Sequence, residues 1–298
     1  MAATFGDLIE EVQSTLSGYG LVRSKMATLA AAITSTTTTL TADSVANVDS
    51  GVIELDQEML YVSTKDESAN TLTIPAWGRG YGGTTAASHA INARLTVNPR
   101  FPRFRVATAI NEEIIALYPD LFGVAVDATQ STVSVKIGYP VPADVESIMS
   151  VDYRQIGPAI YWRPVGQYQL DPTASTTDFP TGKALNIFSL MQPGRVLRIQ
   201  YRKRLSALVN ETDLLTTSGL AESARDLVVL GALYRLLLAI DPARLQTSSL
   251  EANHNRDSLP PGTSQGIARQ LLQLHEARKA QERRLLLQQY PMTTTNRF

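Results

Sequence analysis

Three histidines, a glycine-rich stretch and a few acidic pairs are the parts of this sequence whose residue types could support chemistry. The histidines, His89, His254 and His275, are far apart in the chain and lack the paired spacing of zinc ligands. Cysteine is absent, which excludes disulfides, thiolate metal ligands and thiol nucleophiles. We therefore predict no catalytic residue, no metal and no cofactor, and a protein that is not an enzyme.

The glycine-rich stretch from Gly78 to Gly83 exposes backbone N–H groups, as a phosphate-binding loop does. No lysine follows in the position that such loops require, and the next segment has the pattern of a strand rather than a helix. A structural loop is the better interpretation. Gly80 and Gly83 permit positive φ, and we expect Arg79 and His89 to hydrogen-bond loop carbonyls and hold the loop rigid.

Acidic and aromatic residues also have a structural interpretation. Glu112 and Glu113 are adjacent in a predicted helix, so they point in different directions, and a solvated face is expected. Several aromatic residues near predicted loops could stack on a ligand, but Tyr and Trp are also preferred anchors of protein interfaces. We favour a core or interface role for Trp77, Tyr81, Tyr153, Tyr161, Trp162 and Tyr168.

The composition is that of a folded protein without a general attraction to polyanions. The chain has 298 residues, 44% of them hydrophobic and 18% charged, with a net charge of −1. It is long enough for one large domain or two to three small ones. The apolar run from Leu227 to Ile240 is shorter than the ~20 residues needed to cross a bilayer, and the first residues lack the pattern of a secretory signal. A soluble protein made in a cytoplasm, with no membrane partner, is expected.

Apolar residues at three- and four-residue spacing predict four helices. The first begins after a Thr4 N-cap and ends near Gly18. The others run from about Arg103 to Tyr118, from Glu222 to Ile240, and from Thr263 to Gln289. We expect Pro119 to end the second helix, Asp241-Pro242 to end the third, and the third to be central because it is apolar on most of its circumference.

Two regions between the helices have the texture of strands. Residues 27–97 are rich in Thr and β-branched residues, with turn signals about every ten residues, which predicts a small antiparallel barrel or sandwich. Residues 131–205 form the second region. Val133 to Ile137 and Val196 to Tyr201 alternate strictly in polarity there, so both are predicted strands.

These patterns predict an α+β fold in which a helical core is interrupted by two β-rich insertion modules. The expected divisions are 1–26 for the first core helix, 27–98 for a small antiparallel β-module, 99–125 for a core helix and 126–210 for the second β-module. The central core helix takes 211–242, a linker 243–262, and a C-terminal helix with its tail 263–298.

One stretch is similar to a known family. Asp56, Glu58, Met59, Tyr61 and Val62 are followed by the run Arg-Gly-Tyr-Gly-Gly-Thr-Thr-Ala-Ala-Ser-His from Arg79 to His89, and then by Asn-Pro-Arg-Phe-Pro at 98–102 leading into a helix. This pattern resembles the head-to-tail connector (adaptor or neck) proteins of tailed bacteriophages. The resemblance covers residues 1–125 well, and the C-terminal helices only by general layout. It implies that the helical core is an adaptor-like bundle.

The resemblance also implies a function and partners. Family members are structural virion proteins that form a ring, commonly of twelve copies, between the portal and the tail, with a channel through which DNA passes. The implied partners are other copies of the chain, the portal protein, a tail or stopper protein, and DNA in transient non-specific contact. Similar motifs occur in tail and fibre proteins, so the alternative is a tail or baseplate component whose β-modules bind a host surface.

Two sets of residues are candidates for these contacts. Apolar positions are sparse between Leu274 and Leu285, so the helix from Gly266 to Gln289 is expected to extend from the body and dock on the portal; a helix packed on the body and frayed at its end is the alternative. The candidate portal contacts are Leu271, Leu274, Arg278, Arg283, Leu286, Tyr290 and Phe298. The candidate DNA contacts are Arg198, Arg202, Lys203 and Arg204, which otherwise form a solvated strand edge or a subunit contact.

Overall fold

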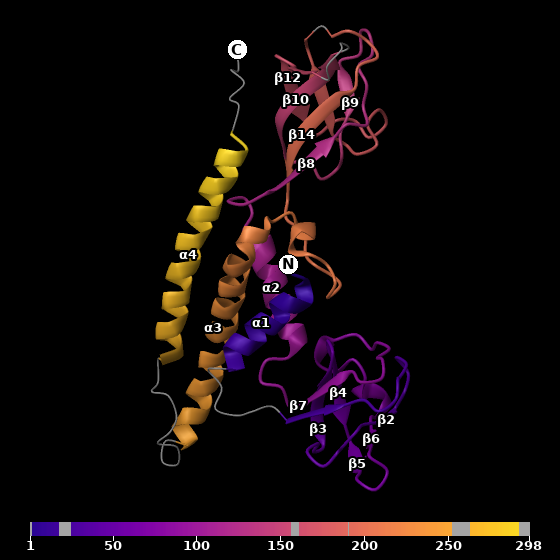
Figure 1. Ribbon diagram of the computed structural model, residues 1–298, viewed down its shortest axis with the longest axis vertical. Coiled ribbons are helices and arrows are strands. Elements are labelled where there is room, and N and C mark those ends of the chain that lie inside the picture. Colours follow the sequence, from indigo (N-terminus) through magenta and orange to yellow (C-terminus); the bar gives the residue numbers. More distant parts are fainter. Residues whose placement is uncertain (1, 18–24, 156–160, 190, 252–262, 292–298) are drawn as a thin grey trace.

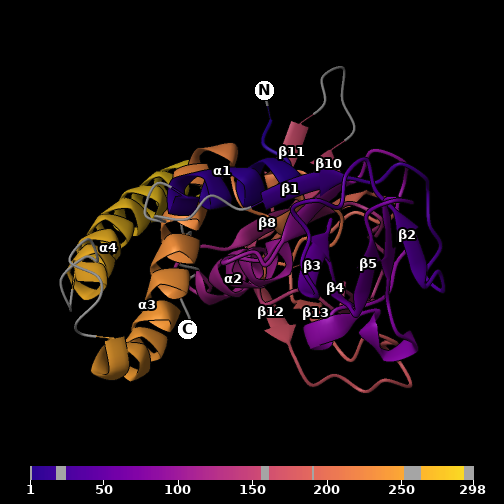
Figure 2. The ribbon, with the colours of Figure 1, turned by 90° about the horizontal axis from the view of Figure 1, so that it is seen from below.

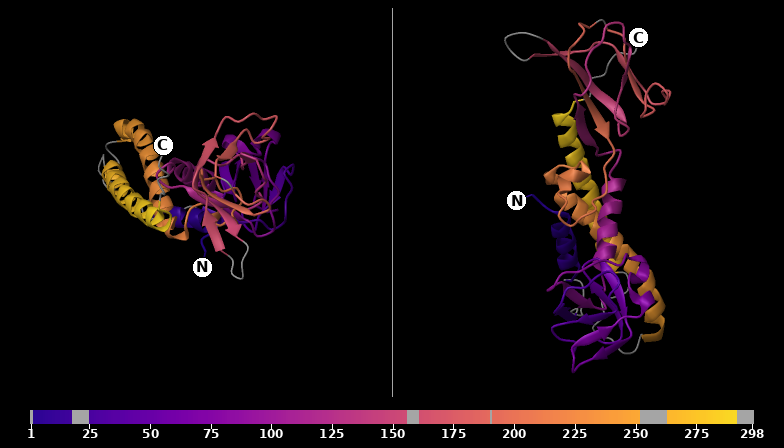
Figure 3. Two further views of the ribbon diagram at one scale, coloured as in Figure 1. Left: turned by 90° about the horizontal axis from the view of Figure 1, so that it is seen from above. Right: turned by 90° about the vertical axis from the view of Figure 1, so that its right-hand side faces the viewer.

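The molecule is elongated, with a β unit at each end and helices between them. The computed structural model describes residues 2–17, 25–155, 161–189, 191–251 and 263–291. The N-terminal β unit, the helices and the second β unit, which comes from the middle of the sequence, follow one another along the long axis (Figure 1). Figure 3 shows the two β units at opposite ends of this axis.

Four α-helices form the middle layer: α1 (Phe5–Ser17), α2 (Arg103–Ala116), α3 (Arg225–Glu251) and α4 (Thr263–Gln289). Thr4 begins α1 as a capping box, because its hydroxyl accepts from the N–H of Asp7 while the Asp7 carboxylate accepts from the N–H of Thr4, which confirms the predicted cap. α3 and α4 lie side by side, and α1 crosses beside them (Figure 2). The apolar faces of the helices meet in one cluster that includes Leu8, Ile110 and Leu227.

The N-terminal β unit contains β1 (Lys25–Thr28), β2 (Thr39–Thr41), β3 (Gly51–Leu55), β4 (Glu58–Val62), β5 (Thr64–Asp66), β6 (Thr71–Thr73) and β7 (Arg94–Val97). They form two sheets, ordered β1-β7-β3-β4 and β2-β6-β5. The sheets join on one side where β4 continues through Ser63 into β5, and on the other where Leu29 bridges Ala42. The result is a small barrel in which β1 and β4 lie three strands apart on opposite sides.

The second β unit also contains two sheets. One has the order β11-β10-β14-β8, from Tyr161–Pro164, Ser147–Gln155, Leu197–Lys203 and Gly123–Asp127. The other has the order β12-β13-β9, from Tyr168–Asp171, Ala184–Ile187 and Gly138–Pro140. Period-two burial along β14 places Leu197, Ile199 and Tyr201 in the core between the sheets.

The predicted fold class is wrong. Strands in four sheets, rather than a helical core bundle, organise the chain, and only 31% of it is helical. The described residues form three separate hydrophobic clusters, and two of these lie inside the β units. The β regions are therefore units with cores of their own at the two ends of the molecule, not insertions that decorate a bundle. Helical periodicity in the sequence is conspicuous, but it does not reveal that each β region has a core of its own.

Two local predictions also fail. Helix α3 continues past Asp241-Pro242 to Glu251, so the linker predicted from residue 243 begins as helix; its remainder, 252–262, lies outside the described residues. A proline removes one backbone hydrogen bond of a helix, and the rest of the ladder can continue. The predicted strand from Val133 to Ile137 is a turn, in which Val135 has a φ of 70°. Its flanking residues are already paired elsewhere, because Thr132 bonds Arg195 and Ile137 bonds Ile187.

Candidate partner-binding surfaces

The loop after β6 is held by one buried arginine. The Arg79 guanidinium donates two hydrogen bonds to the Glu58 carboxylate, from Nε at 2.8 Å and from Nη2 at 2.9 Å. Its remaining donors reach the backbone carbonyls of Thr34, Thr37 and Ala87 at 2.7 to 2.8 Å. One side chain thus ties this loop to a second loop that is far away in the sequence.

Glu58 is the centre of this cluster. It also accepts from the backbone N–H groups of Gly80 and Ala87, and it lies 2.9 Å from His89 Nε2. Burial disfavours its charged form, but the bonds from Arg79, Ala87, His89 and Gly80 outweigh burial and lower the pKa of Glu58 to about 2. Glu58 is therefore a permanent anion whose lone pairs are occupied by the protein itself.

His89 lies between two carboxylates. Its Nδ1 is 2.6 Å from Asp56 Oδ2, while its Nε2 faces Glu58. Burial alone would lower the pKa of His89, but hydrogen bonds to Asp56 and Glu58 raise it, which favours the doubly protonated imidazolium. His89 reaches carboxylates rather than the loop carbonyls that we expected, while its backbone pairs with Ile33.

The loop carries two short 3-10 helices, Ala76–Gly78 and Tyr81–Gly83. Gly80 has a φ of 62°, and a Cβ at that position would lie 2.8 Å from the carbonyl oxygen of Thr84, so glycine is required there. Gly83 has a φ of 88° with open space around it. The predicted loop residues Arg79, Gly80, Gly83 and His89 thus lie in one segment, with Arg79 and His89 meeting at Glu58.

Three aromatic rings gather on the outer face of this loop. Tyr61 on β4 packs against Trp77 with ring centroids 4.9 Å apart and against Tyr81 at 5.7 Å. Trp77 is 64% exposed. We call Tyr61, Trp77 and Tyr81 the aromatic cluster. The three rings pack on one another.

Helix α4 does not extend from the body, contrary to the prediction. It packs along α3, with Ala268, His275 and Glu282 buried at seven-residue intervals. Arg278 donates to Asp226 at 2.6 Å. Polar and charged side chains join the partly buried Ile267, Leu271 and Leu286 in this contact, so a count of apolar positions underestimates it.

The buried part of that contact centres on Glu113 of α2. Glu113 is 3% exposed, so the predicted solvated face is wrong for this residue. Its carboxylate receives Arg235 Nε at 2.9 Å and lies 2.7 Å from His275 Nε2. Burial disfavours the charge, but the bonds to His275 and Arg235 outweigh it and lower the pKa of Glu113. A Cβ on Gly231 would overlap the Glu113 side chain, so a glycine in α3 makes the space for it.

The predicted portal contacts divide between buried and exposed positions. Leu271 and Leu286 pack partly against the helical cluster, whereas Leu274 is 51% exposed. Arg283 is exposed and lies 3.2 Å from Asp120, and Tyr290 is half-buried. Phe298 lies outside the described residues.

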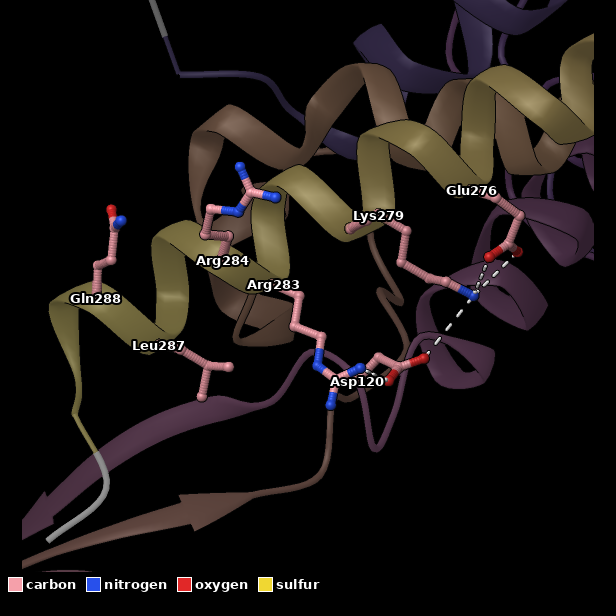
Figure 4. A pocket seen from close by; sticks show the side chains of 8 residues that line it. Asp120, Glu276, Lys279, Arg283, Arg284, Leu287 and Gln288 are labelled. Carbon is pink, nitrogen blue, oxygen red and sulfur yellow. Dashed lines mark hydrogen bonds and ion pairs between the residues drawn. The ribbon is translucent and has the colours of Figure 1, made fainter.

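A pocket of about 560 Å³ lies between the last turns of α4 and the loop that carries Asp120 (Figure 4). Lys279 and Arg283 both point toward Asp120, and Lys279 also pairs with Glu276 at 2.9 Å. The lining residues are Asp120, Glu276, Lys279, Ala280, Arg283, Arg284, Leu287 and Gln288. No serine, threonine or histidine is among the residues that line this pocket.

The basic run lies on β14 apart from Arg204, which directly follows it. Because β14 is an internal strand between β10 and β8, the run is not the solvated edge that we considered. Arg198 pairs with Asp152 at 2.9 Å, and Arg204 pairs with Glu146 at 2.9 Å. Arg202 stacks over the ring of Phe122 at 4.1 Å. The structure therefore places these cations on one strand or directly after it, but it pairs two of them with carboxylates.

Across the described residues, no group of three or more histidines and carboxylates is arranged to hold a metal ion. His254, the third histidine of the sequence, lies outside the described residues. None of the helices in the described part of the chain has the length and apolarity to span a membrane.

A comparison with protein-family models decides the family. Residues 84–283, more than half of the chain, match the family described as SU10 adaptor protein. The chain belongs to this family of phage adaptor proteins. It is accordingly a structural component of a bacteriophage virion that interacts with other virion proteins. No curated protein and no protein of solved structure matched the chain.

The match differs in extent from the resemblance seen in the sequence. It includes α2, the second β unit, α3 and most of α4 of this adaptor protein, whereas the resemblance was assigned to residues 1–125. Only the end of the motif, from Thr84 to His89, falls within the matched residues. Most of the N-terminal β unit therefore lies outside the part that defines the family.

Proposed function

We propose that copies of this adaptor protein form a closed ring between the portal and the tail, with a central channel for DNA. The family match across 84–283 is the observation that carries the proposal. The elongated shape supports it, because two structurally different ends can face two different neighbours (Figure 1). Copies that contact head to tail around an axis close into a ring when the rotation per copy divides a full turn.

The ring would contain twelve copies, with the portal protein on one face and a tail or stopper protein on the other. Analytical ultracentrifugation of the full chain, and averaged images of particles viewed along their axis, test the number of copies. A ring of about twelve supports the connector. A trimer would instead favour the alternative, a tail or baseplate component that binds a host surface, and would overturn the connector.

The portal contact in this proposal is the outer face of α4, together with the residues that follow it. The reason is the pair of exposed leucines, Leu274 and Leu285, which lie eleven residues apart and so on the same face of the helix. Next to them are Arg283, which is exposed, and Tyr290. Exposed apolar residues flanked by cations form a surface that a protein partner can cover.

This contact is best tested without removing α4, because truncation after Gln265 would also strip His275 from the buried Glu113. The double variant Leu274→Glu, Leu285→Glu leaves the buried seam of α4 intact. It should lose co-sedimentation with portal rings, while a control at exposed Val209, Val209→Glu, should bind as the unaltered chain does. Unchanged binding of the double variant would mean that α4 is merely a surface element.

The same proposal gives β14 a transient contact with DNA phosphates in the channel. Arg202 and Lys203 have no carboxylate partner among the described ion pairs, so they can contact a passing phosphate most readily. Replacing both with Gln should reduce the salt dependence of weak DNA binding, because each lost phosphate contact lowers the slope by about one. An unchanged slope would remove these residues from the channel lining.

A further inference from the structure

The aromatic cluster is an exposed, rigid surface that the family match does not explain. Tyr61, Trp77 and Tyr81 all precede residue 84, where the match begins. Trp77 is 64% exposed, although an indole normally stabilises a protein by being buried. Tryptophan and tyrosine are the residues most enriched among the energetically dominant positions of protein interfaces.

The support beneath the cluster is unusually extensive for a surface loop. Arg79, which lies between Trp77 and Tyr81, is fixed by Glu58 and by three backbone carbonyls. Gly80 and Gly83 allow the backbone to turn at both sides of Tyr81. A binding surface that is already ordered loses little conformational entropy on association. The loop therefore presents its rings in a fixed arrangement.

The opposite side of the same barrel carries a complementary surface. Met26 on β1 is 51% exposed, and it faces outward because Ala27 beside it is buried. Methionine sulfur makes favourable contacts with aromatic rings. The neighbouring Lys25 side chain is 54% exposed, with its ammonium 3.7 Å from Asp49 Oδ2. A cation is also attracted to the electron-rich faces of Trp and Tyr rings. We call Lys25 and Met26 the β1 flank.

The position of these two surfaces fits a contact between copies. The barrel order β1-β7-β3-β4, closed through β5, β6 and β2, puts β1 and β4 on opposite sides. Two complementary surfaces on opposite sides of one unit allow each copy to bind the next in the same orientation, which is the requirement for a closed ring.

We propose that the aromatic cluster of one copy binds the β1 flank of the neighbouring copy, so that the N-terminal β units form a second tier of ring contacts. The proposal rests on the ring of the proposed function and assigns one of its lateral interfaces. Three rings cover much less than the roughly 1,000 Å² that a stable interface needs, so this contact adds to contacts in the matched region rather than replacing them.

Because the chain has no cysteine, introduced cysteines are the only thiols that a cross-linker can join. Ala76 is exposed beside Trp77, and Thr28 lies on the outward face of β1, so Ala76→Cys and Thr28→Cys leave the proposed contact residues in place. With a short bismaleimide, the full chain carrying both cysteines should give a ladder of covalent oligomers. A mixture of the two single variants should stop at dimers. Cross-linking of Ala76→Cys to itself would show that clusters meet each other and would overturn the proposal.

A second measurement uses the cluster itself. Trp77→Ala should weaken association of the full chain by about tenfold or more in ultracentrifugation, as for a dominant interface residue. Phe188→Ala, which removes an exposed aromatic ring from the other β unit, should change it little. Circular dichroism of both variants checks that they remain folded.

The outcomes separate the two proposals. A ring with no ladder, and with association unaffected by Trp77→Ala, would overturn the lateral contact and leave the connector standing. A chain that stays monomeric at all concentrations, with no ladder, would overturn the ring and the lateral contact together.

Discussion

Replacing Glu58 by Gln should destabilise the N-terminal β unit strongly, because five donors converge on that carboxylate. The donors are two guanidinium nitrogens of Arg79, two backbone N–H groups and the His89 ring. The pKa of Glu58 falls from 4.5 to about 2, which corresponds to about 3 kcal/mol in favour of the charged form. An amide in its place supplies one acceptor fewer and turns an N–H₂ group toward the donors. We expect a loss of about 3 kcal/mol in the free energy of unfolding at pH 7.

The assay is urea unfolding followed by the fluorescence of Trp77, in a Trp162→Phe background that leaves one indole in the chain. The control is Glu67→Gln, which removes an exposed carboxylate paired with Lys65 and should cost less than about 0.5 kcal/mol.

The pH dependence has a definite sign. A carboxylate whose folded pKa is depressed stabilises the fold above its unfolded pKa, and this stabilisation disappears as pH falls through the folded value. The gap between the unaltered chain and Glu58→Gln should therefore shrink as pH falls from about 4.5 to about 2. A Glu58→Gln variant as stable as the control at pH 7, or a gap that does not depend on pH in this range, would refute the reasoning.

Three further predictions follow from other buried or strained positions. Burial, opposed by the hydrogen bond from the Arg103 N–H, raises the pKa of Glu54 to about 7, so the free energy of unfolding should fall as pH rises from 4.5 to 7. In urea unfolding at pH 8, Glu54→Gln should therefore be more stable than the unaltered chain by up to about 3 kcal/mol. Equal stability of the two chains at pH 8 would contradict this. His275→Ala removes a partner of the buried Glu113 carboxylate and should cost about 3 kcal/mol in the docking of α4. Faster amide hydrogen exchange in α4 checks it, and unchanged exchange would rule it out. Val135 is 98% exposed at a φ of 70°, so Val135→Asn should raise the melting temperature through a gain of about 1 kcal/mol; a lower melting temperature would count against strain at this turn.

Several features could be predicted from the sequence because they depend on neighbours in the chain. Phe5, Leu8, Val12 and Leu16 recur with the helical period, and α1 buries each of them. The Thr4 cap needs only a residue three positions away. The order of residues from Arg79 to His89 was sufficient to suggest a phage virion protein, and the family comparison supports an adaptor through a different, larger part of the chain.

Other features depend on contacts between residues that are far apart in the chain. Glu112 and Glu113 are the same residue type in adjacent positions, yet only Glu113 is buried, because Arg235 and His275 come to it from α3 and α4. The alternating residues Val133 to Ile137 favour a strand, but Thr132 bonds Arg195 just before β14 and Ile137 bonds Ile187 on β13, which leaves only a turn between them.

The cysteine-free composition, the helical and strand periods, and the motif of the loop were determined by the sequence alone, since each is a local property. Only the tertiary structure decided that each β unit has a core of its own, that α4 packs on the body with charged side chains in the contact, and that Trp77 and Met26 lie on opposite sides of one barrel. The physical reason is that burial of a charge or exposure of a ring depends on partners distant in the chain, and periodicity carries no information about those partners.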